Sequence, residues 1–124
     1  MRIKGIVWLG TRTAHYSEMR EFVARITGLE PWLDEPGFAV FDLASGDRIE
    51  VMSQDSDAPP YDAPTAGFLV DDVSAARAEL EAEGIEFIGP IGRADDGNSW
   101  SHFRAPDGSV YELTAQPGHP SHET

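Results

Sequence analysis

The pattern of apolar and polar positions predicts the same order of elements twice along the chain. Residues 2–10 and 65–70 are rich in strand-forming side chains. Each is followed by a segment with helical spacing of its apolar positions, 17–28 and 73–84, that ends in glycine. Three more strand patterns follow each helix, at 30–35, 37–43 and 47–52 and then at 85–91, 99–105 and 109–113. The pattern predicts an α+β fold made of two tandem βαβββ modules.

The two halves also match residue by residue. When residues 41–50 are set over 103–112, a phenylalanine, a turn glycine and a final glutamate coincide. Glu50 and Glu112 are thus paired positions of an internal repeat. Three matches together with the same order of elements indicate a duplication.

The domain organisation follows from this repeat. We predict one domain over residues 1–117, with a first module at about 2–53 and a second at about 64–116. The proline-rich, polar segment 54–63 has no periodicity, which is typical of a linker. Residues 118–124 are predicted to be a disordered tail.

Composition narrows the classes of function. The 124 residues contain 22 acidic and 9 basic side chains, a net charge of −13 that phosphate backbones repel, so a nucleic-acid partner is not expected. The chain has no cysteine and no apolar run long enough to span a membrane, and we interpret it as a cytoplasmic protein with no membrane partner. The acidity has two interpretations that stay open: solubility, or a preference for cationic ligands.

Three phrases carry a family resemblance: "FVARITGLEP", "GFLVDDVSAARAELEAEGIEF" and "FRAPDGSVYEL". They resemble the vicinal oxygen chelate superfamily, which includes glyoxalases, bleomycin-binding proteins, fosfomycin-modifying enzymes and extradiol dioxygenases. The resemblance covers residues 2–116. It implies that the curled mixed sheets of the two modules form a cup, and that the protein is a homodimer.

The resemblance also implies four ligand positions in metal-dependent members: a His or Gln on each module's first strand and a Glu on each last strand. These positions correspond here to Trp8, Glu50, Thr65 and Glu112. An indole has no lone pair for a metal, and two carboxylates with a threonine are a poor set for zinc, nickel or iron. No cofactor is therefore expected, and a divalent metal is the less favoured alternative.

Hairpin geometry predicts what else lines the cup. If Ser45-Gly46 and Asp107-Gly108 are two-residue turns, Phe41 lies opposite Glu50 and Phe103 opposite Glu112. Met52 then follows on the same face. Trp100 and His102 point towards a helix, unless a β-bulge in residues 97–103 reverses them. The candidate substrate-binding residues are Trp8, Phe41, Glu50, Met52, Thr65, Trp100, His102, Phe103 and Glu112.

The leading hypothesis is a small-molecule binding protein similar to the metal-free bleomycin-resistance branch, with an acidic, aromatic-lined cup for a cationic or aromatic ligand. Catalysis is left open and not favoured. The alternatives are a metal-dependent lyase, isomerase or dioxygenase, and a metal-free enzyme with Glu50 or Glu112 as general base. A carboxylate with a raised pKa deep in the pocket would indicate the metal-free enzyme. An interaction module without a small-molecule ligand is a further alternative.

Overall fold

A computed structural model describes residues 1–55 and 64–121, and it contains the predicted order of elements. The α+β class and the two βαβββ modules are confirmed. The first module has β1 (Ile6–Thr13), α1 (Tyr16–Thr27), β2 (Leu33–Glu35), β3 (Phe38–Asp42) and β4 (Arg48–Ser53). The second has β5 (Thr65–Leu69), α2 (Val73–Ala82), β6 (Phe87–Arg93), β7 (Ser99–Arg104) and β8 (Val110–Ala115). Most of the predicted linker, residues 56–63, and residues 122–124 of the predicted tail lie outside the described residues.

The chain divides into two compact units. The first-repeat unit is Trp8–Thr65, and the second-repeat unit is Met1–Val7 with Ala66–Thr124. The N-terminal segment belongs to the second because its backbone bonds to β5: the Lys4 N–H donates to the Leu69 carbonyl (2.9 Å), and the Leu69 N–H donates to the Gly5 carbonyl (2.9 Å). No helix among the described residues is long and apolar enough to cross a membrane.

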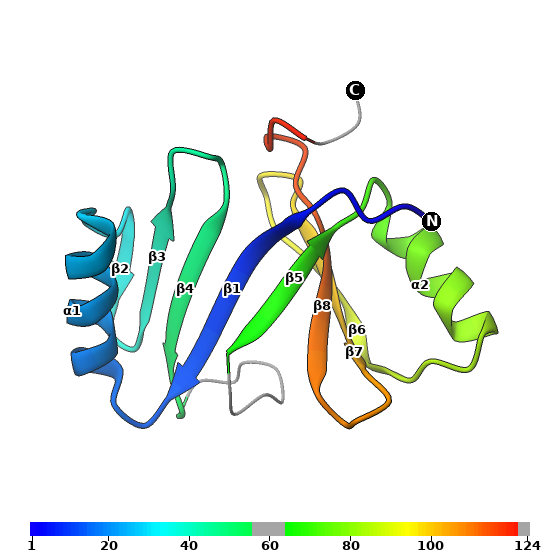
Figure 1. Ribbon diagram of the computed structural model, residues 1–124, viewed down its shortest axis with the longest axis horizontal. Helices are drawn as coiled ribbons and strands as arrows, with labels where there is room; N and C mark the ends of the chain where they lie inside the picture. Colours follow the sequence, from blue (N-terminus) through cyan, green and yellow to red (C-terminus); the bar gives the residue numbers. More distant parts are fainter. Residues whose placement is uncertain (56–63, 122–124) are drawn as a thin grey trace. The chain divides into compact units, whose positions relative to one another are not determined.

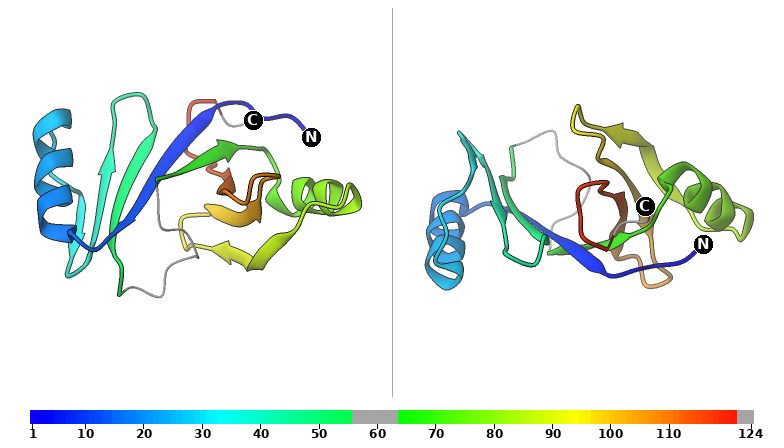
Figure 2. Two further views of the ribbon diagram at one scale, coloured as in Figure 1. Left: turned by 60° about the horizontal axis from the view of Figure 1, so that its bottom comes forward. Right: turned by 90° about the horizontal axis from the view of Figure 1, so that it is seen from above.

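The first-repeat unit is a mixed sheet with α1 along one face (Figures 1 and 2). Its strand order is β2-β3-β4-β1, with β1 parallel to β4 and the other pairs antiparallel. The core between helix and sheet contains Val23, Ala39, Phe41 and Val51. In α1 only part of the predicted apolar face is covered, because Val23 is buried whereas Phe22 and Ile26 are exposed.

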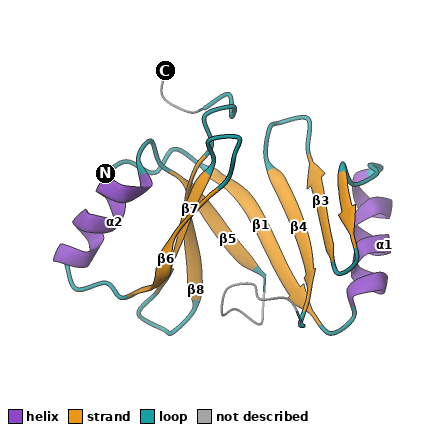
Figure 3. Cartoon of the chain, turned by 180° about the vertical axis from the view of Figure 1, so that it is seen from behind, coloured by secondary structure: helices purple, strands orange, loops and turns teal. Residues whose placement is uncertain are grey.

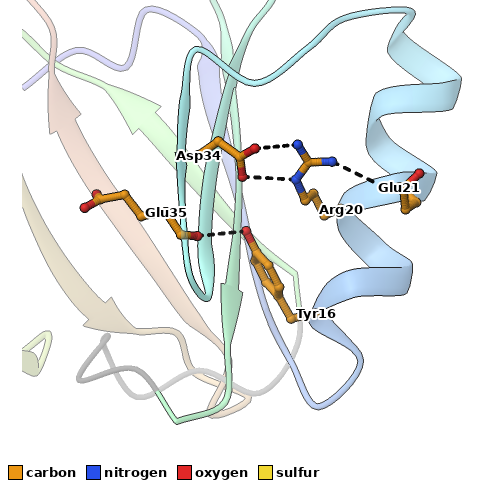
Figure 4. Close-up of polar contacts among 5 residues, drawn as sticks. All are labelled: Tyr16, Arg20, Glu21, Asp34 and Glu35. Atoms are coloured by element: carbon orange, nitrogen blue, oxygen red, sulfur yellow. Dashed lines mark hydrogen bonds and ion pairs between the residues drawn. The ribbon is translucent and has the colours of Figure 1, made fainter.

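A charged contact fixes α1 against β2 (Figure 4). Arg20 donates from Nε and Nη2 to the two carboxylate oxygens of Asp34, a two-point contact that the planar guanidinium makes well. This contact lowers the pKa of Asp34 below its ordinary value. One turn earlier, the Tyr16 hydroxyl donates to the Glu35 carbonyl (3.4 Å). The helix is therefore held at its N-terminal half by polar contacts as well as by its buried side chains.

The second-repeat unit repeats this arrangement with strand order β5-β8-β7-β6 and α2 beside the sheet (Figure 3). β5 is parallel to β8, and β6, β7 and β8 form an antiparallel meander. The core under α2 contains Val70, Val73, Ala76 and Leu113. Asp72 caps α2, since its carboxylate accepts a hydrogen bond from the Ala75 N–H (3.0 Å).

The two hairpins that set the register of these sheets are not the predicted two-residue turns. The Leu43 N–H donates to the Asp47 carbonyl (2.8 Å), and the Gly46 N–H donates to the Leu43 carbonyl (2.9 Å). Three residues therefore form the loop, and Gly46 takes the left-handed conformation (φ 93°) that a turn with a G1 bulge requires. The 105–109 loop has the same pattern, with Gly108 at φ 91°.

This extra residue shifts the pairing by one position and so reverses the predicted faces. Phe41 lies opposite Ile49, not Glu50, and it is fully buried in the core under α1. Phe103 lies opposite Tyr111, not Glu112, and packs against the core under α2. The predicted placement of both phenylalanines on the carboxylate face is wrong. Trp100 and His102 are likewise on the carboxylate face and not the helix face.

Substituting Phe41 by Ala tests whether its side chain lies in the core under α1. Because the side chain is 0 % exposed in the core, we expect Phe41→Ala to lower the free energy of unfolding by about 3–5 kcal/mol in urea titrations. Phe22→Ala is the matched control, since Phe22 is 48 % exposed, and should cost about 1 kcal/mol or less. Equal small losses for both variants would contradict the placement of Phe41 in the core.

Candidate functional site

The two glutamates of the repeat occupy equivalent positions in their sheets. Glu50 on β4 lies between Gly10 of the parallel strand β1 and Val40 of the antiparallel strand β3. Partners across a sheet share a face, so this face of the first-repeat unit is opposite the one that α1 covers. Met52 lies two residues further along the same face and is buried.

Trp8 covers the glycine next to Glu50. A Cβ atom on Gly10 would lie 2.1 Å from Cη2 of the Trp8 indole, so the ring lies directly over this position and excludes any side chain there. Trp8 itself is 6 % exposed. The sequence marks this approach only as a glycine within a strand pattern, a signal of close backbone contact that our sequence analysis did not use.

In the second-repeat unit Glu112 has a polar neighbour instead of a valine. It lies between Gly67 of the parallel strand β5 and His102 of the antiparallel strand β7. His102 Nε2 is 3.1 Å from Glu112 Oε1, and both side chains are only 6 % exposed. Thr65, at the start of β5, is the last residue of the first-repeat unit and is buried.

Burial changes the pKa of the Glu112 carboxyl. Loss of water around it raises the pKa of Glu112 above its ordinary value, and the contact with His102 opposes this rise without cancelling it. The carboxyl therefore holds its proton to higher pH than an exposed glutamate does. A buried carboxyl next to an imidazole can accept and release a proton, or it can accept a hydrogen bond from a bound molecule.

An aromatic ring lies on the same face of this unit. Trp100 pairs with Thr114 of β8, two pairs along from His102 and Glu112 and therefore on the same face. Its indole lies over Gly92 of β6, where a Cβ atom would be 2.2 Å from Cε2. Both tryptophans on the carboxylate faces thus lie over glycines, Gly10 and Gly92, where a larger residue would collide with the ring.

The residues that the resemblance places at metal-ligand positions are a poor fit for a transition metal. The indole of Trp8 offers only an N–H donor, and its ring occupies the space over Gly10 beside Glu50. Thr65 offers a hydroxyl in place of an imidazole or amide. Within residues 1–55 and 64–121, no group of three or more His, Asp or Glu side chains is placed to hold a metal ion.

Comparison with known proteins gives the family. The model of the Glyoxalase/Bleomycin resistance protein/Dioxygenase superfamily matches residues 5–113. The chain belongs to this superfamily. No protein of curated function matches the sequence significantly.

Solved structures agree with this fold at low sequence identity. Methylmalonyl-CoA epimerase from Mycobacterium tuberculosis is 17% identical with a TM-score of 0.70, covering 92% of this chain and 89% of its own. The Mn(II)-bound glyoxalase from Novosphingobium aromaticivorans is 19% identical with a TM-score of 0.73, covering 99% of this chain and 42% of its own. These similarities establish the fold that this chain shares with them.

The pH dependence of stability tests the state of Glu112. In the unfolded chain this carboxyl ionises around its ordinary pKa of 4.5, and in the folded chain it ionises at higher pH. The stability that the protonated Glu112 carboxyl contributes to the wild type is therefore lost as pH rises from 4.5 through the folded pKa. A glutamine at this position does not titrate. We expect the free energy of unfolding of Glu112→Gln, relative to wild type, to rise between pH 4 and pH 8 in urea titrations.

The control is Glu18→Gln, since the Glu18 side chain is 84% exposed. The free energy of unfolding of Glu18→Gln should stay within about 0.5 kcal/mol of the wild-type value across the same pH range. If the free energy of unfolding of Glu112→Gln, relative to wild type, falls as pH rises, the folded state prefers the ionised carboxylate. That result would contradict the raised pKa.

Proposed function

We propose that this superfamily member binds a small organic molecule with a cationic or aromatic group, on the sheet face that carries Glu112. The observation that supports this most is the buried pair of His102 and Glu112 at 3.1 Å, with Trp100 on the same face. A buried polar pair of this kind costs stability unless something compensates it, and a ligand that hydrogen-bonds to it is one reason to retain it. We also propose that the protein is a metal-free, cytoplasmic homodimer.

The chemistry of this face favours a cation with a flat body. An indole face attracts cations and aromatic rings, and a carboxylate favours a positive charge near it. The net charge of −13 attracts cationic molecules to the protein as a whole. Trp8 and Glu50 provide the same two groups on the corresponding face of the first-repeat unit.

A matched pair of dyes tests the proposal. Proflavine is a flat aromatic cation, and acridine is its uncharged parent ring at pH 7.5. We expect proflavine to bind at least about tenfold more tightly than acridine in fluorescence titrations, and Glu112→Gln to remove most of that difference, because a charge-assisted contact is lost. Glu86→Gln, an exposed carboxylate on the helix side of the same unit, is the control.

Equal preference for proflavine in wild type and Glu112→Gln would contradict this function. Elemental analysis after titration with Zn, Ni, Mn and Fe gives a second, independent check. Stoichiometric metal that is lost in Glu112→Gln would replace the proposal by the metal-dependent enzyme.

A second candidate is a metal-free enzyme with Glu112 as general base. It is supported by the raised pKa of this buried carboxyl and by its contact with His102. The ionised Oε1 would take a proton from an acidic C–H or O–H of the bound molecule, leave an anion, and return the proton to that anion. His102 Nε2, 3.1 Å from Oε1, would hold the carboxylate in place. Exchange of a ligand proton for deuterium in D₂O, abolished in Glu112→Gln, would distinguish this enzyme from a binding protein.

A further inference from the structure

A cavity lies on the helix face of the second-repeat unit, opposite the face that carries Glu112. Its volume is about 540 Å³, within the range of small-molecule pockets, and it opens to solvent. It lies between the end of α2, the N-terminal segment and the sheet. Its lining includes Met1, Ile3, Phe68, Leu80, Phe103 and Tyr111.

Strand alternation separates this cavity from the Glu112 face. Phe68 follows Gly67 on β5 and Tyr111 precedes Glu112 on β8, so their side chains point to the helix side of the sheet. Phe68 and Tyr111 have ring centroids 5.5 Å apart, and Phe103 is 6.2 Å from Tyr111. These three half-buried rings form a continuous aromatic wall that the described side chains of this unit leave partly uncovered.

The charged groups of the cavity pair with other groups of the same unit. Arg104 Nε is 3.8 Å from Glu86 Oε2, and Arg104 Nη1 donates to the Gly108 carbonyl (3.2 Å). The Met1 amine is 2.7 Å from Glu79. A charged ligand would lose water on entering an apolar wall and would find its possible counter-charges already engaged, which is costly. An uncharged molecule avoids this cost and gains by covering the aromatic rings.

We propose that this helix-side cavity binds an uncharged small molecule with an aromatic body. The site is separate from the one on the Glu112 face and does not depend on the function proposed there. The rival occupant is an apolar side chain of a second copy of the chain. The cavity volume of about 540 Å³ is in the range of pockets that hold whole small molecules and exceeds what one apolar side chain fills, so a neutral small molecule is the better fit.

Two fluorescent probes with the same ring system measure this preference. N-phenyl-1-naphthylamine is uncharged, and 8-anilinonaphthalene-1-sulfonate carries a sulfonate. We expect the neutral probe to bind the folded protein with one-to-one stoichiometry and at least about tenfold more tightly than the anionic one. Equal affinities, or no binding of the neutral probe, would overturn the proposal.

The chain offers a closely matched pair of variants to locate the probe. Ala105 lines the cavity at the start of the β7–β8 loop, where its N–H donates to Ser109 and its carbonyl accepts from Gly108. Ala94 has the same place in the β6–β7 loop, with Asn98 and Gly97 as partners, and does not line the cavity. Ala105→Trp should weaken binding of the neutral probe at least about tenfold, whereas Ala94→Trp should not change it.

Two further variants keep the outcome interpretable. Ile3→Trp fills the cavity from the N-terminal segment and should repeat the effect if Ala105→Trp unfolds the protein. Glu112→Gln should leave binding of the neutral probe unchanged. Loss of binding in Glu112→Gln but not in Ala105→Trp or Ile3→Trp would place the probe on the other face.

Sedimentation measures the alternative occupant. A dimer that Ala105→Trp dissociates, with no probe bound to the wild type, would make the cavity an interface between copies. Either result would overturn the proposal.

Discussion

The register of two hairpins determines which side chains share a face with the repeated glutamates. Each hairpin has a three-residue loop that ends in a glycine at positive φ, Gly46 or Gly108, and each places a bulge next to the turn. A one-residue change in either loop would exchange the two faces of its strands. With the observed loops, the phenylalanines go to the helix cores and His102 goes to Glu112. The buried pair, the covered core and the helix-side cavity all depend on this register.

The two repeats have the same strand register around their glutamates, and they differ at one neighbouring position. Each glutamate lies beside a glycine of its parallel neighbour, Gly10 or Gly67. On the antiparallel side the first repeat has Val40 and the second has His102. This single difference gives the second repeat an ionisable pair, and it concentrates the candidate chemistry in one unit.

The sequence was sufficient for the class, the order of elements and the repeat, because these follow from periodicity and from glycines at helix ends. It was insufficient for the register, because Ser45-Gly46 is compatible with a two-residue turn and with a three-residue loop that ends in glycine. Because Asp107-Gly108 has the same ambiguity, the sequence predicted the wrong face for Phe103 and did not predict the contact of His102 with Glu112. The exposure of Phe22 also escaped prediction, because helical spacing shows which residues share a face but not how much of that face another element covers.

The most direct test of the buried His102–Glu112 pair is a carbon-detected NMR titration of the Glu112 carboxyl in wild type and in His102→Gln. We expect the pKa of the wild-type carboxyl to lie above 4.5, its ordinary value, because the carboxyl is buried. We also expect a further rise of this pKa in His102→Gln, because the imidazole stabilises the ionised form. A wild-type pKa at or below 4.5, unchanged by the substitution, would show an exposed carboxyl without a partner and would contradict the buried pair at the centre of the proposed site.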